Sequence, residues 1–194
     1  AQQLVQLYPD DVQSGGGLQL VARCARELNM EDLEFDTLNT IVSYSGDDLN
    51  ALTRLMEICE FRQDWRGLQQ FANKFLAVQP LVSSAHNAMV LASNQLNRPQ
   101  DAVPSLRALQ EMDPVDPAGL HFQLAVALEA ADLKEQARVE ALLALEHSPR
   151  YRAAQKLLVR VHQLLDPEAQ WIVSRPEVGV APSPEPSKSI KEDN

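Results

Sequence analysis

Residues 118–149 read AGLHFQLAVALEAADLKEQARVEALLALEHSP. Small and apolar residues recur in this stretch at every third or fourth position, on both sides of a polar turn at Asp132. That spacing is typical of two amphipathic helices that pack against each other as a hairpin. Pro149 then stops the second helix, because proline lacks the backbone N–H that a helix interior requires. The stretch therefore predicts a complete helix hairpin.

The same pattern recurs along the chain with a period of 34 or 35 residues, a spacing that also separates Pro80, Pro114 and Pro149. Four aligned segments begin at Gly15, Leu49, Ser83 and Ala118. Their clearest columns are Val21, Leu55, Met89 and Leu124; Ala25, Cys59, Ser93 and Leu128; and, at the turn, Asn29, Gln63, Asn97 and Asp132. A repeat of this length predicts stacked hairpins, each of which buries its apolar face against its neighbours.

These columns resemble, in a degenerate form, the signature of the tetratricopeptide repeat (TPR) family. The unit over 118–149 matches it best, through Leu124, Ala125, Ala137, Ala144 and Pro149. The unit that begins at Gly15 matches it least, because Glu34 stands where the pattern has a small residue. The leading aromatic residue of the pattern is replaced in the four units by Leu18, Leu52, His86 and His121. The resemblance implies an all-α fold, a right-handed α-solenoid of tandem TPR-like helix hairpins with a C-terminal capping helix.

The chain is expected to divide into three parts. Residues 1–14 have the pattern of the end of a preceding helix followed by a loop, so we expect the array to continue upstream. Residues 15–166 form the array, with eight hairpin helices between about Gly16 and Leu145 and a capping helix over Arg150–Leu165. Residues 167–194 are rich in proline and serine and predict a flexible tail. Within that tail, Trp171-Ile172-Val173 is expected to fold back onto the array.

Several residues indicate where helices begin and how they pack. Asp64 and Asp116 each precede a helical segment and are expected to be N-caps. Pro104 falls inside the second helix of its unit, which predicts a kink or a late helix start. Cys24 and Cys59 lie among apolar residues at helical spacing. That placement predicts two buried free thiols rather than a disulfide.

The charge of the chain argues against broad binding to nucleic acid. The chain has 194 residues, a formal net charge of -10 and a pI near 4.8. Binding to a phosphate backbone needs clustered lysines and arginines, so a nucleic-acid-binding solenoid is only a distant alternative. No apolar run approaches the roughly 18 residues that a membrane span needs. The sequence therefore predicts a soluble protein with no membrane insertion.

The sequence contains no set of residues arranged for catalysis. Its histidines lack the HExxH pattern of a zinc hydrolase, and Gly15-Gly16-Gly17 lacks the residues of a phosphate-binding loop. The acidic residues Glu31, Asp32, Glu34 and Asp36 lie in the first turn of a predicted helix, where the helix dipole favours them. We therefore expect no enzyme activity, no cofactor and no metal ion. His86 and His121 are expected to be structural substitutes for the aromatic residue of the repeat.

The TPR resemblance implies a non-catalytic protein–protein interaction scaffold that binds a peptide or a partner domain in its concave groove. We expect the first helix of each unit to line that groove. The expected groove residues are Asn50, Thr53, Glu57, Asn87, Leu91, Asn94, Phe122, Val126, Glu129, Lys156 and Arg160. The amides would bond a peptide backbone and the apolar residues would hold anchors. Lys156 and Arg160 would favour acidic residues at one end of the ligand.

Two other interpretations remain open. Residues His121 to Leu158, with an alanine-rich second helix and the stretch His147-Ser148-Pro149-Arg150-Tyr151, are similar to the closing repeats of large bacterial zinc peptidases of the gluzincin type. That resemblance implies an accessory domain of a larger enzyme, whose partner would be an upstream domain of the same polypeptide. It implies no activity here, because no metal or catalytic motif of a peptidase is present. Alternatively, the array only spaces or dimerises a parent protein.

Overall fold

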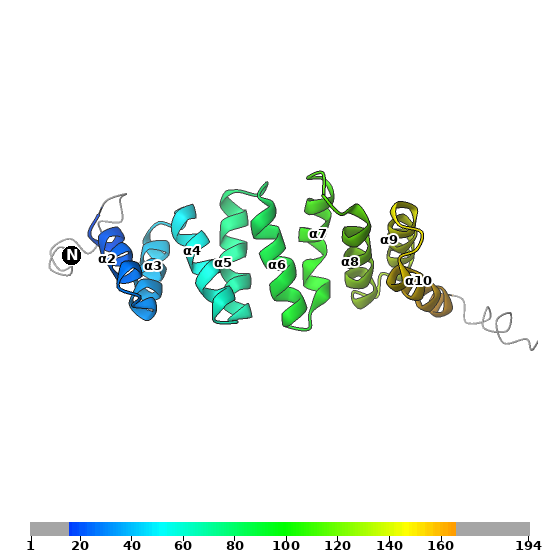
Figure 1. Cartoon of the computed structure of the whole chain (residues 1–194), viewed down its shortest axis with the longest axis horizontal. Coiled ribbons are helices and arrows are strands. Elements are labelled where there is room, and N and C mark those ends of the chain that lie inside the picture. Colours follow the sequence, from blue (N-terminus) through cyan, green and yellow to red (C-terminus); the bar gives the residue numbers. More distant parts are fainter. Residues whose placement is uncertain (1–15, 166–194) are drawn as a thin grey trace, which may run out of the picture.

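The computed structural model describes residues 16–165, which form helices and connecting turns and no strand. Within them, nine α-helices and one short 3-10 helix follow in chain order: α2 (Gly17–Glu27), α3 (Glu31–Tyr44), α4 (Leu49–Phe61), α5 (Trp65–Val78), α6 (Ser83–Gln95), η1 (Pro99–Ala102), α7 (Val103–Gln110), α8 (Pro117–Ala130), α9 (Lys134–His147) and α10 (Arg152–Leu165). The helices stand side by side along the long axis, with α2 at one end and α10 at the other (Figure 1). The all-α solenoid of hairpins with a closing helix, as predicted from the sequence, is confirmed.

Each hairpin turns at one residue in the left-handed backbone conformation. These residues are Asn29, Gln63, Asn97 and Asp132, with φ between 53° and 59°. The N–H of the next residue bonds to the carbonyl oxygen five residues before it, at 2.8–2.9 Å, and the acceptors are Ala25, Cys59, Ser93 and Leu128. This Schellman arrangement satisfies carbonyls that have no partner inside the helix. The turn column of the sequence repeat therefore located the hairpin turns.

Aspartate side chains cap the N-termini of three helices, α4, α5 and α8. The predicted caps Asp64 and Asp116 accept hydrogen bonds from the backbone N–H of Gly67 at 3.0 Å and of Gly119 at 2.9 Å. Asp48, which the sequence analysis did not single out, caps α4 in the same way. Each carboxylate satisfies an N–H that the first turn of its helix leaves unpaired.

The second helix of the third hairpin begins late, as Pro104 predicted. The chain first makes the 3-10 turn η1 from Pro99, and α7 starts at Val103 with Pro104 in its first turn. Proline is tolerated there because the first N–H groups of a helix have no partner in any case. As a result α7 has 8 residues, whereas α5, its equivalent in the preceding hairpin, has 14.

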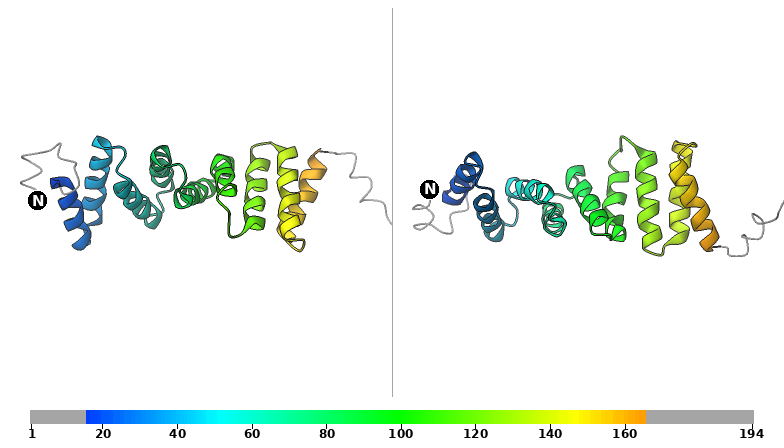
Figure 2. Two further views of the ribbon diagram at one scale, coloured as in Figure 1. Left: turned by 90° about the horizontal axis from the view of Figure 1, so that it is seen from above. Right: turned by 60° about the horizontal axis from the view of Figure 1, so that its bottom comes forward.

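The array has two hydrophobic cores, one in each half. The first core joins α2 to α6 around residues such as Leu55, and the second joins α6 to α10 around residues such as Leu124. Helix α6 belongs to both, because Met89 packs in the first core and Val90 in the second. Figure 2 shows that the hairpins change direction along the long axis. Each hairpin therefore packs mainly on its neighbours in sequence, as in other repeat proteins.

The two cysteines are free, but they lie in different surroundings. Cys59 is buried, as predicted, whereas Cys24 is exposed on α2, so that part of the prediction was wrong. On α2 the residue that occupies the repeat column of Cys59 is Ala25, which is buried. Cys24 comes one residue earlier, which places it about 100° round the helix.

Three acidic residues at the start of α3 are bound by Arg54 of α4 and by Arg62, which directly follows α4. The helix dipole is therefore not their only source of stabilisation. Glu34 is only 3% exposed, and its carboxylate accepts hydrogen bonds from Nε and Nη2 of Arg54 at 2.7 and 3.1 Å. Arg62 binds Glu31 and also Asp32, the latter at 2.8 Å. A buried carboxylate needs such a partner. Arg54 therefore explains how a charged residue occupies a column where the repeat pattern has a small one.

Other predictions concern residues that the structure does not describe. The helix end and loop over 1–14 and the tail over 167–194, including Trp171-Ile172-Val173, lie outside the described residues. Across residues 16–165, every helix is too short or too polar to cross a bilayer.

Candidate partner-binding groove

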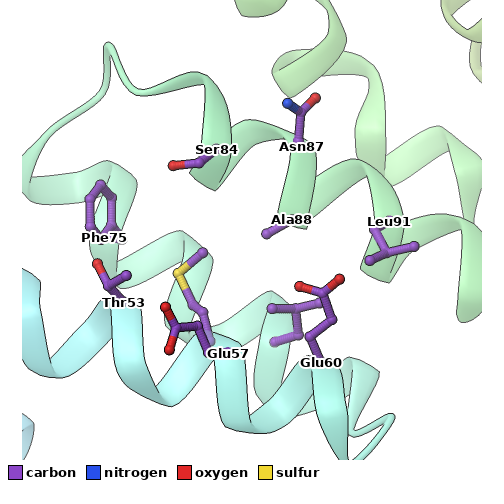
Figure 3. A pocket seen from close by; sticks show the side chains of 10 residues that line it. Thr53, Glu57, Glu60, Phe75, Ser84, Asn87, Ala88 and Leu91 are labelled. Carbon is purple, nitrogen blue, oxygen red and sulfur yellow. The ribbon is translucent and has the colours of Figure 1, made fainter.

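Helices α4 and α6, the first helices of two consecutive hairpins, border a cavity of about 520 Å³. We call this junction the α4/α6 seam. Its apolar floor consists of Met56, Leu68, Phe75, Ala88 and Leu91. Its polar rim consists of Thr53, Glu57, Glu60, Ser84 and Asn87. In Figure 3, Glu57 and Glu60 extend from α4 on one side of the cavity, and Asn87 and Leu91 extend from α6 on the other.

The α4 side of this seam is acidic, whereas the α6 side is uncharged. Glu57 accepts a hydrogen bond from Nη1 of Arg54 on the same helix, at 2.9 Å. No side-chain ion pair within residues 16–165 includes Glu60. The sequence of α6, SSAHNAMVLASNQ, contains no lysine, arginine, aspartate or glutamate. Glu60 therefore brings to the open rim a negative charge that the described part of the chain does not neutralise.

A second cavity, of about 340 Å³, lies on the other side of α6, towards α8. Its lining includes Leu109, Leu120 and the loop residues 112–116 between α7 and α8. Asn87 lines both cavities, so its amide stands between them. An amide can donate and accept hydrogen bonds at once, which suits a peptide backbone that crosses from one cavity to the next.

At the N-terminal end, α2 and α4 border a smaller cavity of about 170 Å³. Asn50 lines it together with Arg23, Arg26 and Arg54. The hydrogen bond to Glu34 is the largest cause of a raised pKa for Arg54, so its charge is already engaged. The sequence predicted a basic end of the groove only at α10, but arginines also line the cavity at α2.

The junction between α8 and α10, which we call the α8/α10 seam, is closed by side chains of the chain itself. The two helices contact each other directly. The ring of Phe122 packs on that of Tyr151, with centroids 4.9 Å apart at 51°. The Glu129 carboxylate accepts hydrogen bonds from Nε and Nη2 of Arg160 at 2.6 and 2.5 Å, which raises the pKa of Arg160. Arg160 is therefore engaged within the chain, whereas Lys156 is exposed.

The structure brings some predicted groove residues together and separates others. The α4/α6 seam contains Thr53, Glu57, Asn87 and Leu91. The neighbouring N-terminal cavity contains Asn50, and Asn94 is exposed on α6. The partly buried residues of the closed seam are Phe122, Val126 and Glu129, while Lys156 and Arg160 lie beside a shallow pocket on α10.

Two residues of the α4/α6 seam, Glu60 and Ser84, were missed by the sequence analysis. The repeat contained the signal that could have found them. Glu60 shares its repeat column with Asn94 and Glu129, and Ser84 shares its column with Asn50. Extending each predicted column through all the units would therefore have included both.

The described residues offer binding chemistry and no arrangement for a metal ion. Within residues 16–165, no group of three or more His, Cys, Asp and Glu side chains is placed to hold a metal. His86 is buried, and its Nε2 lies 2.8 Å from the carbonyl oxygen of Pro80. His121 Nδ1 lies 2.7 Å from Glu140 Oε2, and its ring stacks on His147 with centroids 5.4 Å apart. Both histidines thus make contacts within the array.

The fold is similar to solved structures of TPR proteins. One is YrrB, a TPR protein with an unusual peptide-binding site, with a TM-score of 0.58 and 11% identity over 84% of this chain and 82% of that one. The TPR domain of P58(IPK) has a TM-score of 0.55 and 13% identity over 89% of this chain and 52% of that one. MamA 41-end from Desulfovibrio magneticus RS-1 has a TM-score of 0.53 and 14% identity over 80% of this chain and 87% of that one. At these identities the likeness shows the fold alone. No family model and no curated protein matches the sequence.

Proposed function

We propose that this chain is a non-catalytic scaffold that binds a peptide or an extended segment of a partner protein in its concave groove, at the α4/α6 seam. The observation that carries the proposal is the cavity of about 520 Å³ with an apolar floor and a hydrogen-bonding rim. A concave apolar site with a few polar groups around it is the usual form of a binding site. The TPR-like fold agrees with this function, because stacked hairpins expose extended concave surfaces.

The two sides of the seam would have different tasks. Leu91 and Ala88 border the floor, where an apolar side chain of the ligand would be buried. Such buried anchors supply most of the affinity at protein interfaces. Asn87 would hold the ligand backbone as it passes towards the second cavity, because its amide borders both. A ligand that uses both cavities would therefore be an extended segment.

The partner in this proposal is a protein or a peptide and not a nucleic acid. A protein or peptide fits a groove with an acidic and apolar lining, whereas a phosphate backbone does not, because the net charge is -10. The peptide-binding site of YrrB supports the general idea that this fold can bind peptides. The alternative of an accessory domain of a larger enzyme finds no support among these similar structures, none of which is a zinc peptidase.

A peptide selection tests this proposal. A display library of random dodecapeptides is selected on the whole chain, and the enriched peptides are synthesised. Their affinities are measured by calorimetry for the wild type and for the variants Ala88→Leu and Ala77→Leu. Ala88→Leu fills the floor of the cavity, and we expect it to weaken binding at least tenfold, which is about 1.4 kcal/mol. Ala77→Leu, an exposed change on α5 that borders neither cavity, is the matched control and should bind as the wild type does.

Asn87→Ala should weaken the same peptides without changing the melting temperature, because Asn87 is exposed. The proposal is wrong if no peptide is enriched on the wild type over Ala88→Leu. It is equally wrong if Ala88→Leu and Asn87→Ala leave the affinity unchanged while substitutions on the second helices remove it.

A further inference from the structure

The α8/α10 seam shows which side chains could close the α4/α6 seam, because the two seams occupy equivalent positions of the repeat. Helices α6 and α10 begin 69 residues apart, at Ser83 and Arg152, and the turn residues Gln63 and Asp132 have the same separation. Burial follows this offset, since the equivalent residues Ala85 and Ala154 are both fully buried. The pair α4 and α6 is therefore the repeat equivalent of the pair α8 and α10.

The two seams place a glutamate at the same position but give it different surroundings. In the α8/α10 seam, Glu129 is bound in a fork by Arg160. In the α4/α6 seam, the equivalent residues are Glu60 and Leu91, which lie across the cavity from each other (Figure 3). Leucine cannot neutralise a carboxylate, so Glu60 stands at the repeat position of Glu129 without the cation that Arg160 supplies to Glu129.

The same offset accounts for the open space beside Glu60. Leu157 of α10 is 2% exposed in the second core, and its equivalent in α6 is Ala88, which borders the cavity. A leucine side chain fills a seam that an alanine leaves open. The α4/α6 seam thus lacks both the apolar side chain and the guanidinium that close the α8/α10 seam.

We propose that the partner supplies both groups: an apolar side chain that enters the cavity over Ala88 and an arginine or lysine whose cation binds Glu60. This inference rests on the proposed function and names the chemistry of the ligand. The seam favours such a partner by charge, because Glu57 and Glu60 border the cavity and no lysine or arginine does. Glu57 already binds Arg54, which leaves Glu60 as the residue that selects the cation. Arginine is preferred, because its planar fork matches a carboxylate.

This assignment concerns the α4/α6 seam, whereas the sequence predicted a preference for acidic residues of the ligand at the α10 end of the groove. That expectation depended on Lys156 and Arg160, and Glu129 engages the guanidinium of Arg160. At the α4/α6 seam the charge preference is set by α4, while of the two predicted cations at α10 only Lys156 is not engaged by Glu129. Because Glu60 is exposed at the rim, its contribution is to selectivity and association rate more than to total affinity.

The test uses the enriched dodecapeptides from the selection on the wild-type chain. We expect them to contain an arginine or lysine close to a leucine, methionine or aromatic residue. For one such peptide, affinities are measured for wild type and Glu60→Gln, each with the basic residue present or replaced by glutamine. We expect three- to tenfold loss from either change and little more from both together. Glu146→Gln, an exposed glutamate on α9, is the matched control and should have no effect.

A second variant places an arginine in the α4/α6 seam at the position equivalent to Arg160. Leu91→Arg should form the Glu60 ion pair inside the chain, as in the α8/α10 seam, and lower the affinity for a basic peptide at least tenfold, which is more than for the same peptide with its basic residue replaced by glutamine. The inference is overturned if the enriched peptides are acidic or uncharged, if Glu60 and the basic residue act independently, or if Leu91→Arg binds as well as wild type. If Ala88→Leu still abolishes binding in those cases, the proposed function stands and only the ligand class is wrong. If Ala88→Leu has no effect, the proposed function itself fails.

Discussion

The α4/α6 seam and the α8/α10 seam are built from equivalent positions of the same repeat, yet one is open and the other is closed. The open seam contains a cavity of about 520 Å³ with Glu60 at its rim. The closed seam has Phe122 packed on Tyr151 and Glu129 bound to Arg160. The buried columns are alike in both, since Leu55 and Leu124 are each fully buried.

This difference shows that the scaffold and the binding site are encoded at separate positions of the repeat. The buried columns and the left-handed turn residues build the hairpins and place their helices. Whether a seam is then open or closed depends on a few side chains on its two sides, such as Ala88 or Leu157 and Leu91 or Arg160. A repeat array can therefore keep one seam for its own stability and another for a partner.

The largest difference in stability should come from exchanging the residue that fills the closed seam with the one that leaves the open seam with a cavity. Leu157→Ala removes a buried side chain from the closed seam and should cost about 2–5 kcal/mol of unfolding free energy. Ala88→Leu adds the same side chain where a cavity exists, so we expect a change of less than about 1.5 kcal/mol. Urea unfolding of both variants measures this difference. Equal losses would mean that the two seams are packed alike.

A smaller effect is expected from the aromatic pair. Tyr151→Ala removes the ring that packs on Phe122, and such a ring pair contributes about 0.5–1.5 kcal/mol beyond its buried area. Val82, which stands at the equivalent position before α6, has no ring of its own, so Val82→Ala should cost less. The comparison of seams is weakened if the valine substitution is the more costly of the two.

The ion pair of the closed seam should contribute still less. A double-mutant cycle of Glu129→Gln and Arg160→Gln should give a coupling of about 0.2–1 kcal/mol, because the Arg160 side chain is 59% exposed. Salt at 1 M should reduce this coupling by screening. Glu60→Gln should change stability by no more than about 0.5 kcal/mol, since no described residue pairs with it. A larger loss would reveal an intramolecular role for Glu60.

Thiol labelling compares how readily the two seams open. Burial is the main cause that raises the pKa of Cys59 to about 11, so at pH 8 it is a thiol and should react slowly, and faster as the pH rises towards 11. In a Cys24→Ser chain, Cys59 reports on the first half of the array. The repeat equivalent is reported by Leu128→Cys in a chain without either native cysteine.

We expect Cys59 to be labelled faster than the cysteine at position 128, because the open seam has fewer contacts to break. The rates are corrected for the reactivity of each thiol in urea and for the unfolding free energy that the smaller side chain of Leu128→Cys costs in the second core. In the native wild-type chain, Cys24 should react first, since it is exposed. Slower labelling at position 59 than at 128 would indicate that the second half of the array opens first.

The sequence was sufficient for features that local backbone chemistry fixes and insufficient for side-chain contacts between helices. The turn column, the caps Asp64 and Asp116 and the late start at Pro104 all follow from local backbone chemistry, so they could be predicted. The pairing of Arg160 with Glu129, and of Arg54 with Glu34, joins different helices. Such contacts depend on how neighbouring hairpins stack, which the periodicity of one chain does not specify.

The prediction that Cys24 is buried was wrong for a related reason. An apolar spacing fixes the buried stripe only to within about one residue, and on α2 the stripe passes through Ala25 instead. Glu60 was missed for a different reason, because the predicted groove columns were not extended through every unit. The open seam itself could not be predicted, since it depends on which of the equivalent residues face each other across two helices.

Hydrogen exchange tests the central claim most directly. The whole chain is measured alone and with an enriched basic dodecapeptide, and the protection of equivalent segments is compared. The account predicts slower exchange at residues 53–60 and 84–91 on binding, and no change at residues 126–129 and 153–160, which border neither cavity. Protection at α8 and α10 without protection at α4 and α6 would contradict it.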